Sequence, residues 1–349
     1  MLLQRLSDAF GVSGAEQEVR SILLAEIRDR VDACRIDALG NLIAIKKASG
    51  SPSGRILLAA HMDEVGLMVT TFDDNGLVRF AKVGGIDDRV LPARGVLVGE
   101  KRVPGVIGVK PVHLTEKSDR DQVMSWKQLA IDLGATTRSE AERLVQRGDR
   151  AVVATEFREL AREGSSWRTV QGKALDDRVG CALLAELLRH RYAFDLVAAF
   201  TVQEEVGLRG AGVAAYAEKP DAAIALECTG ANEVPTKKDV NPSTRLGGGP
   251  AITIQDASFI ADARLVRHAT ATAEAQGIPH QYKQPTIGGT DAGAMQRTRA
   301  GVPAITIAVP ARYIHSPAAI MNLNDFDATL TLLREMLARM PVAELRSEP

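Results

Sequence analysis

The stretch Arg55-Ile-Leu-Leu-Ala-Ala-His-Met-Asp-Glu64 determines the architecture expected for this chain, because a short apolar run ends there in polar residues. A continuous apolar run over residues 56–60 is typical of a strand that is buried on both faces. Such a strand belongs at the centre of a parallel sheet, which helices cover on both sides. The polar residues that follow would then lie at the carboxyl edge of the sheet, where open α/β sheets place their sites.

The segments around this run alternate between helix and strand patterns. Ser13 and Glu16 have the spacing of a capping box, which predicts that a helix begins there, and residues 36–45 predict a hairpin. Apolar runs at 196–202, 222–226 and 304–309 predict further buried strands. Helices are expected over residues 137–146, 177–190, 210–219, 257–276, 289–298 and 326–340. We therefore expect a three-layer α/β/α sandwich around a mixed, mostly parallel sheet.

A β-rich segment interrupts this alternation. Short alternating stretches such as residues 67–72 are punctuated by glycine and proline, a pattern typical of a small barrel or sandwich. We predict that residues 1–66 and 168–349 form one catalytic α/β domain. Residues 67–167 would be an inserted small β-barrel domain with a core of its own.

The composition excludes several classes of function. The chain has 349 residues, of which 45% are hydrophobic and 25% charged, and its formal net charge is −1, so no global field attracts it to nucleic acid or anionic lipid. Its apolar runs are too short to span a bilayer, and the N-terminus lacks the pattern of a secretory signal. Three cysteines, Cys34, Cys181 and Cys228, fit a reducing compartment. We expect a cytoplasmic protein without nucleic-acid or membrane partners.

Histidine and carboxylate residues follow the predicted strands at their carboxyl ends. His61 comes directly after residues 56–60, and Asp63, two residues later, points to the same side and can orient the imidazole ring. Glu204 and Glu205 follow another apolar strand. Burying two adjacent carboxylates at the end of a strand costs free energy unless a cation lies beside them. This pattern indicates a metal site.

Three further positions add residues of the same type. Glu227 ends one apolar strand, and His315 lies just beyond another. Asp176 and Asp177 precede a predicted helix, and the capping of that helix would explain one of these acids but not both. Two histidines with several carboxylates form a mixed nitrogen and oxygen ligand set that suits Zn, Co or Mn. Two metal ions need a bridging carboxylate, and one carboxylate remains to act as a base.

A family resemblance rests on five motifs: His61-Met-Asp-Glu-Val-Gly, Ala174-Leu-Asp-Asp-Arg-Val-Gly, Glu204-Glu-Val-Gly-Leu-Arg-Gly-Ala, Gly288-Gly-Thr-Asp and Tyr313-Ile-His-Ser-Pro. Together they resemble the M42 family, the TET-type tetrahedral or glutamyl aminopeptidases, some of which carry the name cellulase or endoglucanase. The resemblance covers almost the whole chain. It implies a zinc-exopeptidase-like catalytic domain with a PDZ-like insertion.

The resemblance also implies residue roles, with two divalent metal ions per subunit (Zn, Co or Mn) held by five ligands: His61, Asp176, Glu205, Glu227 and His315. Asp176 would bridge the two ions, with His61 and Glu227 completing one site. Glu204 would be the general base, and Asp63 the carboxylate behind the histidine. Many members have Asp at the position of Glu227, a departure that bears on substrate preference.

The activity that the resemblance implies is removal of the N-terminal residue from short peptides. A deacylase of N-acyl amino acids or sugars would use the same metal site and remains an alternative. A non-catalytic assembly protein would be expected to lack a ligand or the base, and none is missing. A glycosidase normally needs two free carboxylates beside the sugar, whereas these acids are assigned to metal. The resemblance also implies self-association into a homo-dodecamer built from dimers, with the inserted domain at the dimer contact.

Overall fold

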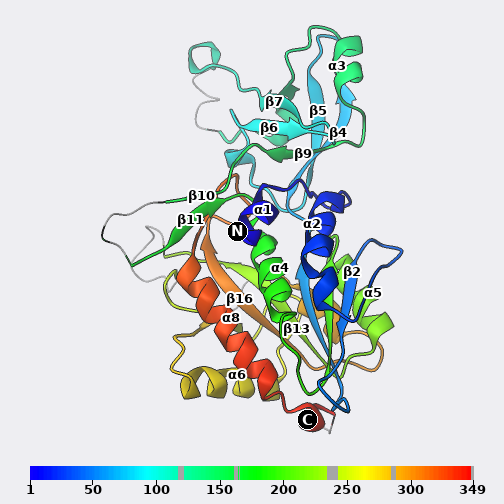
Figure 1. The fold of residues 1–349 in the computed structure, drawn as a ribbon. Helices are drawn as coiled ribbons and strands as arrows, with labels where there is room; N and C mark the ends of the chain where they lie inside the picture. Colours follow the sequence, from blue (N-terminus) through cyan, green and yellow to red (C-terminus); the bar gives the residue numbers. More distant parts are fainter. Residues whose placement is uncertain (117–121, 161–163, 165, 234–242, 284–287, 347–349) are drawn as a thin grey trace.

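The computed structural model describes residues 1–116, 122–160, 164, 166–233, 243–283 and 288–346, which form an α/β body and a barrel beside it (Figure 1). Within these residues, the body contains one mixed sheet of 11 strands. They are β1 (Ala33–Ile36), β2 (Leu42–Lys46), β3 (Arg55–His61), β10 (Arg158–Glu159), β11 (Thr169–Gly172), β12 (Asp195–Thr201), β13 (Ala222–Gly230), β14 (Ala251–Thr253), β15 (Gln281–Lys283), β16 (Ala304–Arg312) and β17 (Ala319–Asn322).

The strand order places the deciding apolar run in the middle of the sheet. It reads β1-β2-β12-β3-β13-β16-β17-β11-β10, and β14 pairs with both β15 and β16. The central strands β12, β3, β13 and β16 are parallel to one another. The neighbours on either side pair in antiparallel fashion: β1 with β2, β2 with β12, β16 with β17, β17 with β11, and β11 with β10. The predicted mixed-sheet sandwich is confirmed, with its four central strands parallel to one another; β14 and β15 form a further parallel pair outside this centre.

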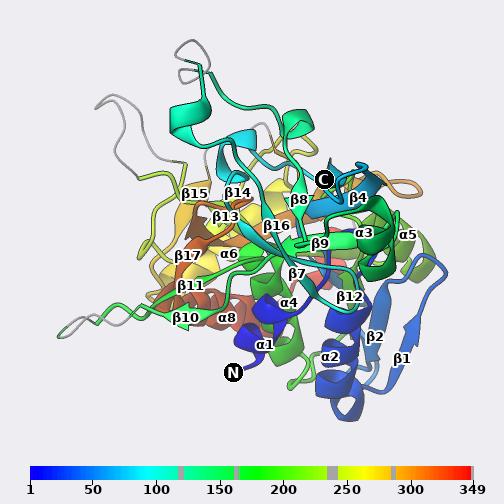
Figure 2. The same cartoon turned by 90° about the horizontal axis from the view of Figure 1, so that it is seen from above.

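Helices cover both faces of the sheet. The α-helices of the body are α1 (Leu2–Asp8), α2 (Gln17–Ile27), α4 (Leu175–Leu187), α5 (Arg209–Glu218), α6 (Ala263–Ala275), α7 (Asp291–Gln296), α8 (Leu323–Ala338) and α9 (Val342–Leu345). Figure 2 shows α1, α2, α4 and α8 along one side of the sheet, while α5 and α7 contact it from the other side. Short 3-10 helices are η1 (Arg28–Arg30), η2 (Asp88–Val90), η3 (Val112–Leu114) and η5 (Trp126–Gln128).

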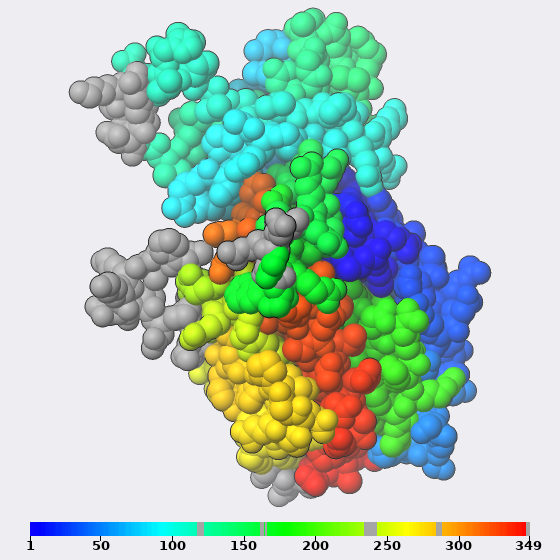
Figure 3. Space-filling model, turned by 60° about the vertical axis from the view of Figure 1, so that its left-hand side comes forward, coloured from blue at the N-terminus to red at the C-terminus, as the bar shows by residue number. Residues whose placement is uncertain are grey.

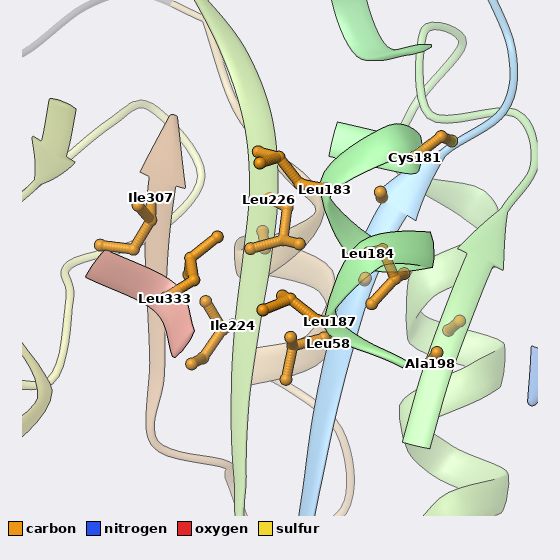
Figure 4. Close-up of a cluster of buried hydrophobic side chains, with 14 of the residues drawn as sticks. Leu58, Cys181, Leu183, Leu184, Leu187, Ala198, Ile224, Leu226, Ile307 and Leu333 are labelled. Carbon is orange, nitrogen blue, oxygen red and sulfur yellow. The ribbon is translucent and has the colours of Figure 1, made fainter. Parts of the chain in front are cut away.

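The main core lies between α4 and the central strands (Figure 4). Leu183 and Leu187 of α4 face Leu58 of β3 and Leu226 of β13, and all four side chains are fully buried. Burying a leucine side chain contributes about 1.5–3 kcal/mol. Because this packing fixes β3 and β13 against α4, it also fixes the residues at their carboxyl ends.

The barrel consists of six strands that close on themselves. They are β4 (Gly66–Phe72), β5 (Val78–Val83), β6 (Gly95–Val98), β7 (Val103–Ile107), β8 (Ile131–Asp132) and β9 (Arg150–Val153), with α3 (Arg138–Leu144) beside them. The apolar cluster of the barrel is separate from the main core, and Figure 3 shows the barrel as a distinct lobe above the body. The predicted inserted barrel is therefore present. That residues 67–167 act as one dimerisation domain stays a prediction, and β10 within that range pairs in the main sheet.

The N-terminal capping box predicted from the sequence is wrong. Helix α2 begins at Gln17, and no side chain caps it. Ser13 instead donates its hydroxyl to a carboxylate oxygen of Asp63 at 2.6 Å, and Glu16 accepts from the backbone N–H groups of Gly14 and Gln203. The side chain of Ser13 thus bonds to a residue distant in the sequence and not to the helix start that the capping box would require.

Two element boundaries also differ from the prediction. Residues 257–262 are not helical, because α6 begins at Ala263, where Asp262 caps it by accepting from the N–H of Arg264. Strand β13 continues to Gly230, so Glu227 lies inside the strand and not at its end. Every helix in the described part of the chain is too short or too polar to cross a bilayer.

Candidate metal centre

The parallel strands bring the candidate residues to one edge of the sheet. His61 is the last residue of β3, Glu204 and Glu205 follow β12, and Glu227 lies near the end of β13. Since these strands are parallel neighbours, their carboxyl ends meet. His315 follows β16 and completes the cluster.

Asp176 lies between the two histidines. Its Oδ1 atom is 3.4 Å from Nε2 of His61, and its Oδ2 atom is 3.2 Å from Nε2 of His315. The two oxygens of one carboxylate thus face two different imidazoles. This is the arrangement that a carboxylate bridging two ions requires.

The inner half of the centre consists of His61 and Glu227 on the buried side of Asp176. Nε2 of His61 lies 3.7 Å from Oε2 of Glu227, and these residues are 1% and 3% exposed. Nδ1 of His61 lies 3.0 Å from the backbone oxygen of Asp63, which can accept its proton. That contact leaves Nε2 free to act as a ligand.

The outer half consists of His315 and Glu205. Nε2 of His315 lies 3.3 Å from Oε1 of Glu205, and Nδ1 lies 3.1 Å from the backbone oxygen of Gly85. Gly85 follows the barrel strand β5, so the barrel contributes a contact to the centre. Positive φ angles at Tyr313 and His315 make the loop after β16 tight enough to turn the ring back toward Asp176.

Asp63 holds the pair of glutamates as well as facing the histidine ring. Its carboxylate accepts from the backbone N–H of Glu204 at 3.0 Å and of Glu205 at 3.2 Å, and from the hydroxyl of Ser13 at 2.6 Å. Its Oδ1 lies 3.5 Å from Nδ1 of His61. Sequence reasoning missed Ser13, because no local signal relates it to a residue 50 positions away.

Asp177 has a structural explanation. It accepts from the N–H of Gly180 at 2.9 Å, within the first turn of α4, and from the N–H of His61 at 3.2 Å. One acid of the pair therefore supports the helix start, as the sequence indicated. An oxygen of Asp177 also lies within 4.8 Å of ligand atoms of His61 and Glu227, but both of its oxygens already accept backbone protons.

Asp291 is a buried acid to which sequence reasoning gave no role. Its Oδ2 accepts from the hydroxyl of Thr201 at 2.6 Å, and its backbone N–H donates to Oε1 of Glu227 at 3.3 Å. It therefore positions the inner glutamate. The Gly288-Gly-Thr-Asp motif was the only sequence signal that pointed to it.

The electrostatics of the cluster fit bound cations. Burial raises the pKa of Glu204 and Glu227 well above the usual range although the charge of His61 opposes it, and burial raises the pKa of Glu205 to about 7. Burial alone would raise the pKa of Asp176, but hydrogen bonds from His315 and His61 outweigh it and lower that pKa. Divalent cations would keep all of these carboxylates ionised. The ligand atoms of Asp176, Glu205 and His315 also lie within 4.8 Å of one another, as one ion requires.

A cavity of about 680 Å³ opens beside the cluster. Glu204, Glu227 and His315 line one part of it, and Ser258 and Lys283 line another. Its volume matches that of ordinary small-ligand sites.

The comparisons agree on one family. The model of the M42 glutamyl aminopeptidase family matches residues 40–332. The chain is 33% identical to the lysyl aminopeptidase of Pyrococcus furiosus, over 97% of this chain and 96% of that protein. It is 32% identical to the glutamyl aminopeptidase of Lactococcus lactis, over 99% of this chain and 98% of that protein.

A solved structure extends the agreement to the fold. The TET1 peptidase of Pyrococcus horikoshii, which assembles into a tetrahedron or a large octahedral shell, superposes with a TM-score of 0.84 at 38% identity. The match covers 97% of this chain and 99% of that one. With its sequence, fold and cluster of histidines and carboxylates all in agreement, the chain belongs to the M42 family of aminopeptidases.

Proposed function

We propose that this aminopeptidase uses two divalent metal ions to remove the N-terminal residue from short peptides. Family membership implies a divalent metal; the number of two and the choice among Zn, Co and Mn belong to the proposal. The observation that carries it is Asp176, whose two oxygens lie 3.4 and 3.2 Å from the Nε2 atoms of His61 and His315. Asp176 would bridge the ions, with Glu227 completing the inner site and Glu205 the outer site.

The chain's own residues supply the proton transfer. When bound, the cations would polarise the carbonyl of the scissile bond and acidify a water molecule near neutral pH. Glu204 is the carboxylate left over from the ligand set, and burial raises its pKa. It accepts the proton of the attacking water and delivers it to the leaving amine. Asp63 fixes the backbone of Glu204 and Glu205, so that the base and the ligand keep their relative positions.

Self-association through residues 67–167 is a second part of the proposal. Exposed apolar side chains in this segment support it: Val106, Val109, Val112, Leu114 and Val123 are each at least 45% exposed. We propose a homo-dodecamer built from dimers that meet through this segment. The cytoplasmic location stays a prediction.

The test of the activity compares free and blocked amines. The metal-free protein would be loaded with Zn, Co or Mn and given leucyl-glycine and N-acetyl-leucine, with the products identified by mass spectrometry. The proposal expects free leucine from the dipeptide and no acetate from the blocked amino acid. Release of acetate with an intact dipeptide would establish the deacylase instead.

A further inference from the structure

The segment that carries Glu204 begins in an unfavourable backbone conformation. Gln203, the residue before Glu204, has a φ angle of 57°, in the left-handed region that glycine enters freely and glutamine rarely does. Such a residue keeps this conformation only when its surroundings hold it, and residues of this kind are concentrated at functional sites. The contacts that hold Gln203 therefore also orient the residue that follows it.

Two buried carboxylates hold this segment by its backbone. Oε1 of Glu16 accepts from the N–H of Gln203 at 3.3 Å. The carboxylate of Asp63 accepts from the N–H groups of Glu204 at 3.0 Å and Glu205 at 3.2 Å. Glu16 and Asp63 are 4% and 0% exposed. Three consecutive N–H groups are thus bound by side chains from distant parts of the sequence.

Both carboxylates are tied to one tight turn near the N-terminus, residues 12–15. A backbone hydrogen bond of 2.8 Å joins its two ends, and its third residue, Gly14, has a positive φ of 80°, a conformation that favours glycine. Its second residue, Ser13, donates its hydroxyl to Asp63 at 2.6 Å. Glu16 follows the turn and accepts from the N–H of Gly14 at 2.7 Å. The position of this turn therefore fixes both carboxylates.

The turn is itself fixed between the body and the barrel. On the body side, the backbone oxygen of Gly11 accepts from the N–H of Glu64, just beyond His61, at 2.9 Å. On the barrel side, Nε of Arg150 in β9 donates to the backbone oxygen of Ser13 at 3.0 Å. A turn held from both sides can serve as a rigid support for the residues that it contacts.

We propose that Ser13 and Glu16 are positioning residues for the general base, which hold the backbone of residues 203–205 so that Glu204 faces the attacking water. The inference rests on the proposed function and adds two residues to it. Ser13 acts through Asp63, whereas Glu16 acts directly on the strained residue Gln203. A displacement of about 1 Å at a reacting group can cost about 10²-fold in rate, so the loss of either support should be measurable.

The first test measures kcat, KM and bound metal in Ser13→Ala and Glu16→Ala with leucyl-glycine as substrate. Each variant should lower kcat per metal-loaded chain by about 10-fold or more and leave KM within about twofold, because the base acts in the transition state. Glu16→Gln keeps an oxygen that can accept from the same two N–H groups, so its kcat should stay within about threefold of the wild-type value. An unchanged kcat in both alanine variants would overturn the proposal.

A variant that already lacks the base separates positioning from general damage. In the Glu204→Gln protein, the further change Ser13→Ala should lower the remaining kcat by less than about twofold, because the group that Ser13 positions is gone. A further loss of about 10-fold in that protein would show that Ser13 acts on something other than the base, and the positioning role would be overturned.

Thr329→Val is the matched control for the loss of a buried hydroxyl. Thr329 is fully buried in α8 and donates to the backbone oxygen of Asp325 at 2.7 Å. Its replacement should lower the free energy of unfolding much as Ser13→Ala does, while kcat stays within about twofold of the wild-type value. If kcat fell equally in both variants, the effect would come from stability and not from the position of Glu204.

Hydrogen exchange tests the same contacts without a substrate. In the metal-loaded protein, amide protons in peptides that cover residues 203–205 should exchange about 10-fold faster in Ser13→Ala and Glu16→Ala, while those of β13 keep their wild-type rates. If no form of the protein hydrolysed any peptide with any metal, the proposed function would fail, and this measurement would still decide whether Ser13 and Glu16 hold the segment. Wild-type exchange rates at residues 203–205 in both variants would overturn their role.

Discussion

The inner and outer halves of the candidate metal centre face the same carboxylate but are held by different means. His61 ends a central strand, its side chain is 1% exposed, and its Nδ1 contacts a backbone oxygen two residues away. The side chain of His315 is 36% exposed, and its Nδ1 contacts Gly85 beyond a barrel strand. The inner half should therefore form together with the main core, whereas the outer half also depends on a loop and on the barrel.

The largest effect is expected from Asp176→Ala, because Asp176 is the one residue that both halves share. Loss of a shared ligand weakens both ions, so activity on leucyl-glycine should fall to background. Metal content after gel filtration should approach zero. Retention of one full equivalent would show that Asp176 does not bridge and would make Asp177, with an oxygen near His61 and Glu227, the next candidate.

Glu204→Gln should lower the catalytic rate while both halves of the centre keep their metal ions. General base catalysis typically contributes about 10²- to 10⁴-fold, so kcat should fall by at least about 10²-fold. Metal content should stay at the wild-type value. If the variant lost metal but kept its turnover per bound ion, Glu204 would be a ligand, and the base would have to be reassigned to Glu205.

Two histidine variants compare the halves directly. His61→Ala and His315→Ala should each lower the affinity for one ion, but only His61→Ala should also destabilise the metal-free protein. It leaves buried carboxylates without their cationic partner, which should lower the free energy of unfolding by about 2 kcal/mol or more. Denaturant unfolding of the metal-free variants measures the difference. Equal losses of stability would show that the outer half is as much a part of the core as the inner half.

Replacement of residues 67–166 by a short Gly/Ser linker should prevent assembly without affecting the inner half of the centre. The shortened chain should give a much smaller particle in light scattering and should bind the outer ion more weakly, because the contact from Gly85 to His315 is gone. Gly85→Ala in the full-length chain is the matched control, since a methyl group there would lie 3.3 Å from Nδ1 of His315 without touching the exposed barrel surface. It should weaken the outer ion by up to about 10-fold and leave the particle intact. An unchanged particle after the replacement would move the assembly contacts to the α/β body.

The sequence predicted the central strands of the main sheet and those residues of the candidate metal centre that lie at the ends of these strands. His61, Glu204, Glu205 and Glu227 follow or end apolar runs, and the parallel pairing of these strands brings them together. This inference needed no knowledge of side-chain contacts.

Residues defined only by distant contacts were missed. Ser13 matched a local capping pattern, yet its partner is Asp63, and nothing in the spacing of a sequence reveals such a contact. Strand β15 has only the residues Gln281–Lys283, too few for a periodic pattern, so the position of Lys283 in the cavity wall was also missed. Tertiary contacts that compete with local preferences are the common cause.

The measurement that tests the two-ion account most directly is a titration of the metal-free protein with cobalt, following bound metal and leucyl-glycine hydrolysis together. The account predicts two equivalents per chain, with the inner ion binding first and most of the activity appearing with the second. His315→Ala should stop at about one tightly bound equivalent with little activity, in line with the loss of one ligand. Full activity at one equivalent in the wild-type protein would contradict the shared role of Asp176 and the two-ion account with it.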